Sequence, residues 1–306
     1  MDNKKNQIIR IAEEKKELPR VFIAQMNMDP FNLEKNCKKV QEYFKQAWKA
    51  GCDFIVFPEY MNGNYTPWRI SNKDNNYFLQ NISKNCKKYG IYAIAGTILV
   101  KTKRKCYNRC HIFDESGRLV GYQDKLSLDG VYEQKYVYEG REQGVFDTKF
   151  GKIGIMICRD FLYQEITDNL VKKGADIIFC PANWCSDMSF FKNANLPFKV
   201  PNSSELNVLK TSIPARAISG EAIIIFCNSG GEVKLNDNYW FKCGGHSQIA
   251  SPFFGTKECI RNTKEGSLIA DIDLKPVLAS RDKAYRIHAL KRNIFWNNLG
   301  KKDILQ

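Results

Sequence analysis

The pattern of apolar and polar positions predicts strands alternating with helices from Arg20 onward. Residues Arg20 to Asn27 form a mostly apolar run, which is typical of a buried strand. The next segment repeats apolar residues every three or four positions from Leu33 to Trp48, so it should form a helix with one apolar face that ends near Gly51. Asp53 to Phe57 is apolar again and is expected to be the second strand. The chain therefore begins with a βαβ unit.

The second half of the chain repeats this plan. Lys49 to Pro58 is echoed by Lys172 to Pro181: in each, a Gly that ends a helix leads into an apolar strand, and a Pro stops it. Two further matches follow along the chain, namely Ile91–Val100 with Ala222–Asn228 and His111–Asp114 with His246–Ile249. The repetition predicts one α/β domain made of two similar halves, with two sheets face to face and helices outside, which is a four-layer αββα sandwich.

Three polar groups are expected where apolar runs end. Phe150 to Ile157 is a strand that should carry Cys158 at its tip, Asp53 to Phe57 should place Glu59 at an equivalent tip, and Lys125 follows a third apolar run. Open α/β sheets place their chemistry at such strand ends. A buried Cys usually acts only as a small apolar residue. The other two groups are what distinguish Cys158 from the ten remaining cysteines.

In this order of Glu, Lys and Cys, the chain resembles the nitrilase superfamily of carbon–nitrogen hydrolases, and within it the amidase or carbamoyl amidohydrolase-like branch. The resemblance rests on motifs spread from about Val21 to Leu274: Phe57-Pro58-Glu59, Asp124-Lys125-Leu126, Cys158-Arg159-Asp160 with Glu165, Ala215-Arg216-Ala217 and Gly244-Gly245-His246-Ser247. It implies the same four-layer sandwich. It also implies an enzyme that hydrolyses a non-peptide C–N bond in a small amide or carbamoyl compound.

The resemblance assigns roles that suit the chemistry. A thiol is nucleophilic only as thiolate, so Cys158 needs a base, and Glu59 is the candidate. Negative charge develops on the carbonyl oxygen during attack, and the ammonium of Lys125 with the backbone N–H of Arg159 would stabilise it. Glu133 matches a second family Glu that positions the Lys, with Glu139 as the competing choice.

Four residues are expected to bind substrate: Arg159, Asn183, Trp184 and Tyr65. Many relatives have Tyr or Trp where this chain has Arg159, and Phe-Pro-Glu where it has Tyr163-Gln164-Glu165. These differences concern specificity and leave the subfamily open. The long segment from Trp184 to Pro214 is expected to be a loop that shapes the acyl pocket together with residues 60–68.

We expect residues 1–19 to be an N-terminal extension with a short helix, 20–278 to form the hydrolase domain, and 279–306 to form a C-terminal segment. The resemblance implies a homodimer or higher homo-oligomer, since nitrilase-like sandwiches pair. The C-terminal segment favours an oligomer interface, because six apolar residues there would otherwise be exposed: Tyr285, Ile287, Leu290, Ile294, Phe295 and Trp296.

Composition limits the remaining possibilities. Eleven Cys without a CxxC pair favour a reducing cytoplasm, and no apolar run is long enough for a membrane helix or follows the N-terminus as a leader. The three His are isolated, so we expect no metal, and the absence of a G-x-G-x-x-G motif or P-loop indicates no nucleotide cofactor.

The net charge of +14 suggests an alternative from another class, a basic and catalytically silent nucleic-acid or ligand-binding protein. Lysines in the first helix alternate with Glu34 and Glu42, as on a solvated face, so we expect no nucleic-acid partner. An alternative with the same fold is a nitrilase that acts on a nitrile.

Overall fold

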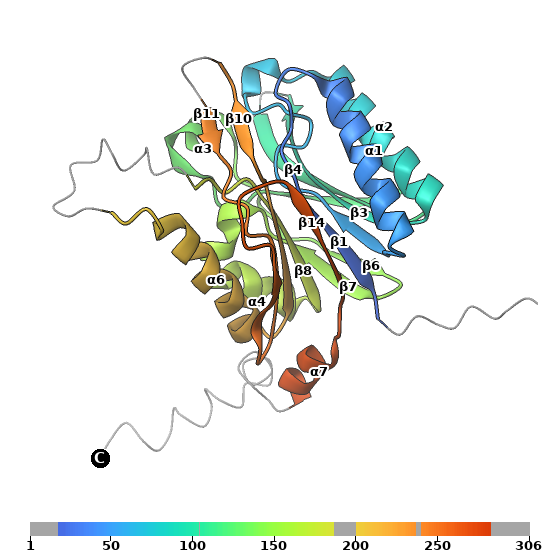
Figure 1. Ribbon diagram of the computed structural model, residues 1–306, viewed down its shortest axis with the longest axis vertical. Coiled ribbons are helices and arrows are strands. Elements are labelled where there is room, and N and C mark those ends of the chain that lie inside the picture. Colours follow the sequence, from blue (N-terminus) through green and yellow to red (C-terminus); the bar gives the residue numbers. More distant parts are fainter. Residues whose placement is uncertain (1–17, 104, 187–199, 237–239, 283–306) are drawn as a thin grey trace, which may run out of the picture.

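The computed structural model describes residues 18–103, 105–186, 200–236 and 240–282. Across these residues two six-stranded sheets pack face to face and helices cover both outer faces, which gives four layers in the order αββα (Figure 1). The predicted α/β sandwich is therefore confirmed.

The first sheet has the strand order β14-β1-β2-β3-β4-β5. Its outer face is covered by α1 (Leu33–Lys49) and α2 (Asn72–Tyr89), which lie side by side (Figure 1). The strands are β1 (Arg20–Gln25), β2 (Phe54–Val56), β3 (Tyr92–Thr102), β4 (Lys105–Phe113), β5 (Leu119–Asp124) and β14 (Gly266–Asp271).

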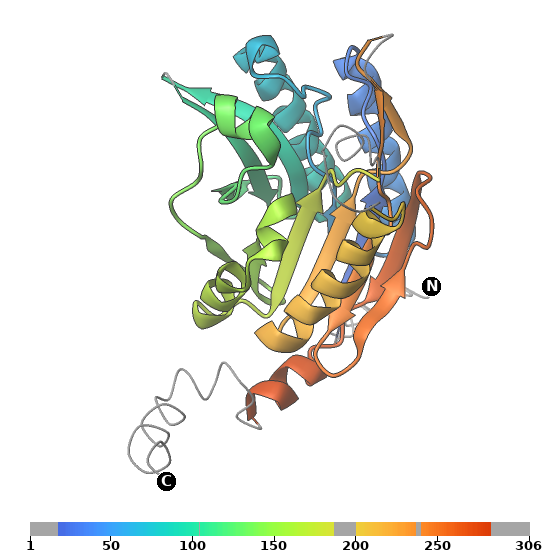
Figure 2. The same cartoon turned by 90° about the vertical axis from the view of Figure 1, so that its left-hand side faces the viewer.

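The second sheet has the strand order β13-β12-β9-β8-β7-β6, and α4 (Gln164–Lys172) and α6 (Ser204–Gly220) cover it (Figure 2). A hairpin of β10 (Glu232–Lys234) and β11 (Trp240–Lys242) projects at the opposite end from α7 (Lys275–Asp282) (Figure 1). The short helix α3 (Gly130–Tyr136) follows β5 in the chain. The strands are β6 (Val145–Thr148), β7 (Gly151–Ile155), β8 (Ile177–Ala182), β9 (Ile223–Asn228), β12 (Gln248–Ser251) and β13 (Gly255–Cys259).

Strand pairing follows the predicted repeat. In the first sheet β1, β2 and β3 are parallel, and β4 and β5 continue antiparallel. In the second sheet β7, β8 and β9 are parallel, and β12 and β13 continue antiparallel. Each sheet gains one antiparallel edge strand beside its first strand, β14 next to β1 and β6 next to β7. The five strands β1 to β5 thus correspond to β7, β8, β9, β12 and β13.

Two details of the predicted repeat are wrong. Glu59 follows β2, whereas Cys158 follows β7, which is equivalent to β1, so their strand ends are not equivalent. The predicted match of residues 111–114 with 246–249 identifies two equivalent strands, but it aligns the wrong residues within them. Ala93 pairs with Phe113 and the equivalent Ile224 pairs with Ala250, which aligns position 111 with 248. A turn with left-handed backbone at His246 (φ 55°) makes β12 begin later than the sequence suggests.

The continuous apolar runs arise because the central strands are covered on both faces. Along β1, Val21 and Ile23 pack into the core between the two sheets, while Phe22 and Ala24 pack into the core beneath α1 and α2. One strand therefore contributes to both cores.

The apolar face predicted for the first helix is present in α1, with one exception. Val40, Phe44 and Ala47 are buried, but Trp48 is 55% exposed. Successive helical residues lie about 100° apart, so a position next to Ala47 falls at the edge of the buried face. The Trp48 ring packs instead on Tyr89, with 6.0 Å between ring centroids.

The expected loop from Trp184 to Pro214 is wrong in its last part, because α6 begins at Ser204 and includes Pro214. Leu209, Ile213 and Ala217 are buried at spacings of four, and this apolar face holds the helix on the sheet despite the Pro. Residues 187–199 lie outside the described residues, as do 1–17 and 283–306. The expected N-terminal helix and most of the predicted oligomer segment therefore stay predictions. No helix in the described part of the chain is long and apolar enough to cross a membrane.

Candidate active site

The structure brings four predicted residues from both halves of the chain together. Glu59 lies three residues after β2, Lys125 directly follows β5, and Glu133 lies in α3. Cys158 lies three residues after β7, in the other sheet. The backbone N–H of Glu59 donates to the carbonyl of Ala182 across the two sheets (3.3 Å). The site therefore exists only because the sheets pack face to face.

Lys125 is the centre of this cluster. Its side chain is 1% exposed, and its Nζ lies 3.0 Å from Glu59 Oε1 and 2.7 Å from Glu133 Oε2. A buried ammonium is stable only when it is paired. Burial lowers the pKa of Lys125, but Glu59, Cys158 and Glu133 outweigh it and hold that pKa well above its usual value. Lys125 is therefore a fixed positive charge.

The two carboxylates differ in charge state. Burial raises the pKa of Glu59; Lys125 opposes this rise and the negative charge of Glu133 adds to it, with a net increase. Burial acts to raise the pKa of Glu133 as well. Lys125, Tyr60 and the backbone of Asp129 outweigh burial and hold the pKa of Glu133 below its usual value. Glu133 is thus a permanent anion that holds Lys125, and Glu59 is the carboxylate suited to exchange a proton.

Two residues that the sequence analysis did not assign complete the network. Asn108 Nδ2 donates to Glu59 Oε1 (2.7 Å) and Glu133 Oε1 (3.0 Å), and the hydroxyl of Tyr60 donates to Glu133. A signal for Asn108 was present in the sequence. In β4 it occupies the buried phase of an alternating strand, between Cys106 and Cys110, where a polar residue is unusual.

Cys158 is held in a strained turn. Its φ of 48° is in the left-handed region, which is uncommon for a residue other than Gly, and it begins the short 3-10 helix η2 (Cys158–Leu162). Such strain clusters at functional sites. Within the described part of the chain, the backbone N–H of Arg159 donates no hydrogen bond. This N–H and the ammonium of Lys125 remain the two predicted oxyanion donors.

The thiol of Cys158 is neutral at rest. Burial and the charge of Glu59 raise its pKa well above the usual value, and Lys125 only partly offsets them. Glu59 contacts the thiol, and its Oε2 accepts the backbone N–H of Asn183 at 2.9 Å. A neutral thiol beside a carboxylate of raised pKa is suited to lose its proton during attack.

Asp160 joins the segment after Cys158 to the segment after Lys125. Its carboxylate accepts hydrogen bonds from the backbone N–H groups of Ile157 (2.9 Å), Ser127 (2.7 Å) and Leu126 (3.2 Å). Burial raises the pKa of Asp160 to about 7, although these three hydrogen bonds act to lower that pKa. Arg216 of α6 supports the same turn from outside, through hydrogen bonds to the carbonyls of Phe161 and Leu162.

The predicted substrate-binding residues surround this centre. Arg159 forms a half-exposed ion pair with Asp129 at 3.3 Å. The Tyr65 ring packs on Tyr60, with 5.2 Å between centroids.

Asn183 and Trp184 directly follow β8. Asn183 donates its N–H to Glu59, and the Trp184 ring packs on Phe161 with 5.0 Å between centroids. The backbone of Trp184 is held by the side chain of Asn228.

Several other candidates lie elsewhere. Glu139 is exposed, so Glu133 is the residue that the fold places beside Lys125. Glu165 is exposed in the first turn of α4. Burial lowers the pKa of His111 to about 4, and Nδ1 of His246 bonds the carbonyl of Gly244. No group of three metal-ligating side chains occurs among the described residues. His288 lies outside them.

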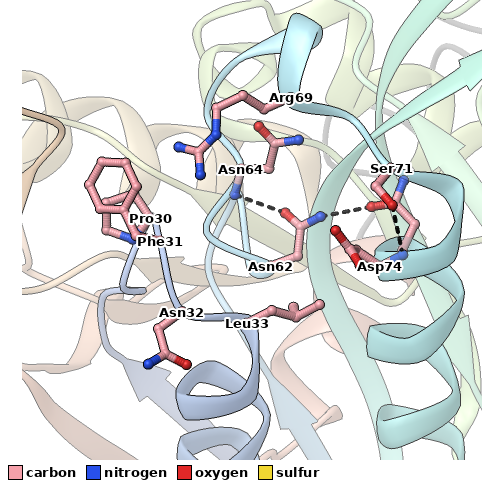
Figure 3. A pocket seen from close by; sticks show the side chains of 10 residues that line it. Pro30, Phe31, Asn32, Leu33, Asn62, Asn64, Arg69, Ser71 and Asp74 are labelled. Carbon is pink, nitrogen blue, oxygen red and sulfur yellow. Dashed lines mark hydrogen bonds between the residues drawn. The ribbon is translucent and has the colours of Figure 1, made fainter.

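A polar cavity lies beside the segment of residues 60–66 (Figure 3). Asn62 and Asn64 line it from that segment, and Phe31 and Arg69 line it from two others, with the guanidinium of Arg69 over the Phe31 ring at 4.8 Å. None of the predicted catalytic residues lines this cavity.

The carbon–nitrogen hydrolase family matches residues 20–282, which is most of the chain. The chain belongs to the carbon–nitrogen hydrolase family. Among its relatives, a nitrilase of Pyrococcus abyssi is 27% identical over 83% of this chain and 90% of its own. A 2-oxoglutaramate amidase of Bacillus subtilis is 25% identical over 85% and 93%, and the omega-amidase of Mus musculus is 25% identical over 82% and 86%.

Solved structures show the same fold for this carbon–nitrogen hydrolase. An amidase from Nesterenkonia, of the nitrilase superfamily, superposes with a TM-score of 0.73 over 90% of this chain and 96% of its own, at 16% identity. A Saccharomyces cerevisiae member of branch 10 of the nitrilase superfamily gives a TM-score of 0.69 over 88% and 96%, at 20% identity. The predicted family and enzyme class are confirmed.

Proposed function

We propose that this carbon–nitrogen hydrolase is a thiol amidase that hydrolyses a small amide or carbamoyl compound through a thioester on Cys158. The observation that supports this most is the charge arrangement: one fixed ammonium at Lys125, one permanent anion at Glu133, and a carboxylate of raised pKa at Glu59 beside a neutral thiol.

In the first step the sulfur of Cys158 attacks the carbonyl carbon while its proton passes to Glu59. The carbonyl oxygen becomes negative and is stabilised by Lys125 and the N–H of Arg159. When the C–N bond breaks, Glu59 returns the proton to the leaving nitrogen, and ammonia or an amine departs. The product of this step is the Cys158 thioester.

In the second step water attacks the thioester carbon and gives its proton to Glu59. The same two donors stabilise the second oxyanion, the C–S bond breaks, and the sulfur recovers a proton from Glu59. Glu133 and Asn108 take no part in proton transfer in this scheme. They hold Lys125 and Glu59 in place.

The test is release of ammonia from a panel of small amides, with Cys158→Ala as the background. The panel should include neutral aliphatic amides, carbamoyl compounds and ω-amides of dicarboxylic acids, because relatives are named omega-amidase and 2-oxoglutaramate amidase. Arg159 is the nearest guanidinium to the thiol by sequence, and a preference for carboxylate-bearing amides that is lost in Arg159→Gln would assign it to substrate binding. No Cys158-dependent release from any amide would sink the proposal.

A nitrilase is the second candidate, because a relative that is 27% identical bears that name. A parallel nitrile panel distinguishes the two. A nitrile carbon accepts the same thiolate, so the distinguishing result is which panel is turned over with the higher kcat/KM.

A further inference from the structure

Two cysteines face each other across a strand pairing beside the candidate active site. Cys185 and Cys243 form an isolated antiparallel bridge between the segment that follows β8 and the residue that follows β11. The flanking hydrogen bonds are Ser186 N–H to Lys242 O (3.0 Å) and Gly244 N–H to Trp184 O (2.7 Å). This pattern makes Cys185 and Cys243 a non-hydrogen-bonded pair, the closer of the two antiparallel kinds.

The backbone of this pair suits a disulfide. Residues opposite each other at such a position have Cα atoms about 4.5 Å apart and side chains on the same face. Disulfides span Cα separations of roughly 4.4–6.8 Å, so this pair can be bridged without backbone movement. Both side chains are thiols in the structure.

The positions of the two sulfur atoms agree with the backbone. Cys185 Sγ lies 3.7 Å from the carbonyl oxygen of Asn183, and Cys243 Sγ lies 3.8 Å from its Oδ1. Both thiols also lie close to Tyr65: burial raises the pKa of that hydroxyl well above its usual value, and Cys243 and Cys185 add to the rise. The thiols therefore converge on two predicted substrate-side residues.

The two cysteines differ in their exposure to solvent. Cys185 is half-buried, whereas Cys243 is buried, and burial raises the pKa of Cys243 to about 12. Among the eleven cysteines only Cys185 and Cys259 are not fully buried. Cys259 pairs with Gln248 across its strand and has no cysteine opposite. An oxidant can thus reach two thiols, and only one of them has a partner in disulfide geometry.

We propose that Cys185 and Cys243 are a redox modification site that forms a reversible disulfide next to the catalytic centre. A hydroperoxide oxidises the Cys185 thiolate to a sulfenic acid and is itself reduced to an alcohol or water. The sulfur of Cys243 then attacks the Cys185 sulfur, its proton joins the leaving hydroxyl as water, and the S–S bond forms. A thiol reductant reverses the reaction.

The disulfide acts on the active site through Asn183. Oxidation removes the S–H group of Cys243 that donates to Asn183 Oδ1, and it ties residues 183–186 to β11. The backbone N–H of Asn183 donates to Glu59 and also faces the sulfur of Cys158. We expect the oxidised form to lose activity severalfold, a step that rests on the proposed amidase function.

The decisive experiment uses the full chain with Cys158→Ala, so that the catalytic thiol does not compete. The reduced protein is treated with hydrogen peroxide, remaining thiols are blocked with N-ethylmaleimide in denaturant, and tryptic peptides are mapped without reduction. The expected product links Cys243 to Cys185, with fragment ions separating Cys185 from Cys180 on the same peptide. The link should carry most of the Cys185 peptide, vanish in Cys158→Ala/Cys185→Ser, and persist in the matched control Cys158→Ala/Cys259→Ser.

The site is overturned if Cys185 stays a thiol, becomes sulfinic acid, or bonds any cysteine other than Cys243 while circular dichroism shows folded protein. The coupling to activity is read separately, in wild type and Cys185→Ser. Peroxide should inactivate wild type more than Cys185→Ser. Dithiothreitol should restore the additional activity that wild type has lost. Equal reversible losses in both would overturn the coupling, and absence of any activity would count against the proposed function but not against the disulfide.

Discussion

The two halves of the chain build the same five-strand pattern but contribute different chemistry. Pairing within the sheets aligns Val21 with Ile153 and Phe54 with Ile177. Counting onward along the chain, Cys158 then corresponds to Met26, and Glu59 corresponds to Ala182. The first half supplies the proposed base Glu59, the ammonium of Lys125 and the carboxylate of Glu133, and the second half supplies the thiol of Cys158.

This division shows what the repeated fold provides. Equivalent strands deliver residues to the same end of both sheets, so each half offers the same positions for a functional side chain. The cluster arises because non-equivalent positions of the two halves carry its polar side chains and are buried against each other. Met26 is fully buried, and Ala182 offers Glu59 only a backbone carbonyl. Neither half could form the cluster alone.

The strongest way to break the comparison is to remove Cys158, the proposed nucleophile and the contribution of the second half. Cys158→Ala should reduce kcat for amide hydrolysis by on the order of 10³ or more, since loss of a nucleophile removes the covalent route. The fold should persist, because an Ala fits where the thiol was. Ammonia release and a thermal melt check both points. Substantial turnover in the folded variant would falsify the assignment.

Changing the two carboxylates of the first half should give unlike results. Glu59→Gln removes the base and should cost about 10²–10⁴ in rate. Glu59 acts as carboxylate and its pKa is raised, so in wild type kcat/KM should fall as pH drops through a value above the ~4.3 usual for Glu. Glu133→Gln removes the nearby negative charge that raises this pKa, so the acid limb should move to lower pH.

Profiles of kcat/KM against pH for wild type and Glu133→Gln measure this shift. An acid limb that does not move, or that moves upward, would show that Glu133 does not act on Glu59 through its charge.

Lys125→Ala removes the ammonium that we propose as an oxyanion donor. We expect a loss of about 10² in kcat. It also leaves two buried carboxylates without their cation, which should lower the free energy of unfolding by about 3–5 kcal/mol. Rates and melting temperatures are measured together. Arg281→Ala is the control, because Arg281 pairs with Asp176 just before β8, at the opposite end of that strand from Asn183. A kcat loss equal in both variants would reassign Lys125 to a structural role.

Asn108→Ala should have a smaller effect. It removes one donor to Glu59 and one to Glu133, so we expect the acid limb of kcat/KM to move to higher pH and stability to fall by about 1–3 kcal/mol. Asn75→Ala is the matched control, since Asn75 is also a buried Asn that bonds two groups, Asn62 and the carbonyl of Leu99. Its stability should fall similarly with no shift in the pH profile. A shift in both would point to a general loosening.

The smallest effect is expected when binding to nucleic acid is measured. Three lysines at the start of α1 are already paired with carboxylates, Lys35 with Asp29, Lys38 with Glu34 and Lys39 with Glu265. We therefore expect only weak binding of DNA or RNA that vanishes with modest salt. A gel-shift titration at physiological salt measures it. Tight, sequence-independent binding there would favour the basic-protein alternative.

The sequence by itself determined the first βαβ unit and its repetition in the second half, whereas α6 begins in a segment predicted to be a loop. The spacing of three and four in α1 and the apolar runs of β2 and β8 are patterns among neighbouring residues. They can therefore be recognised from the sequence alone. The repeat of Lys49–Pro58 in Lys172–Pro181 then gave two similar halves, and the spaced motifs around Glu59, Lys125 and Cys158 gave the family.

Only the tertiary structure decided which groups meet. Asn108 lies 49 residues from Glu59 along the chain, and no local pattern joins them; their bond exists because β4 carries Asn108 on its buried phase toward the end of β2. Glu133 lies in α3 beside Lys125, whereas Glu139 lies beyond the end of α3 and is exposed, and this packing distinguishes the two. The approach of Cys185 to Cys243 likewise required the β10–β11 hairpin to fold back on the segment after β8. Contacts between distant segments depend on how sheets and turns pack, and that information is spread over the whole chain.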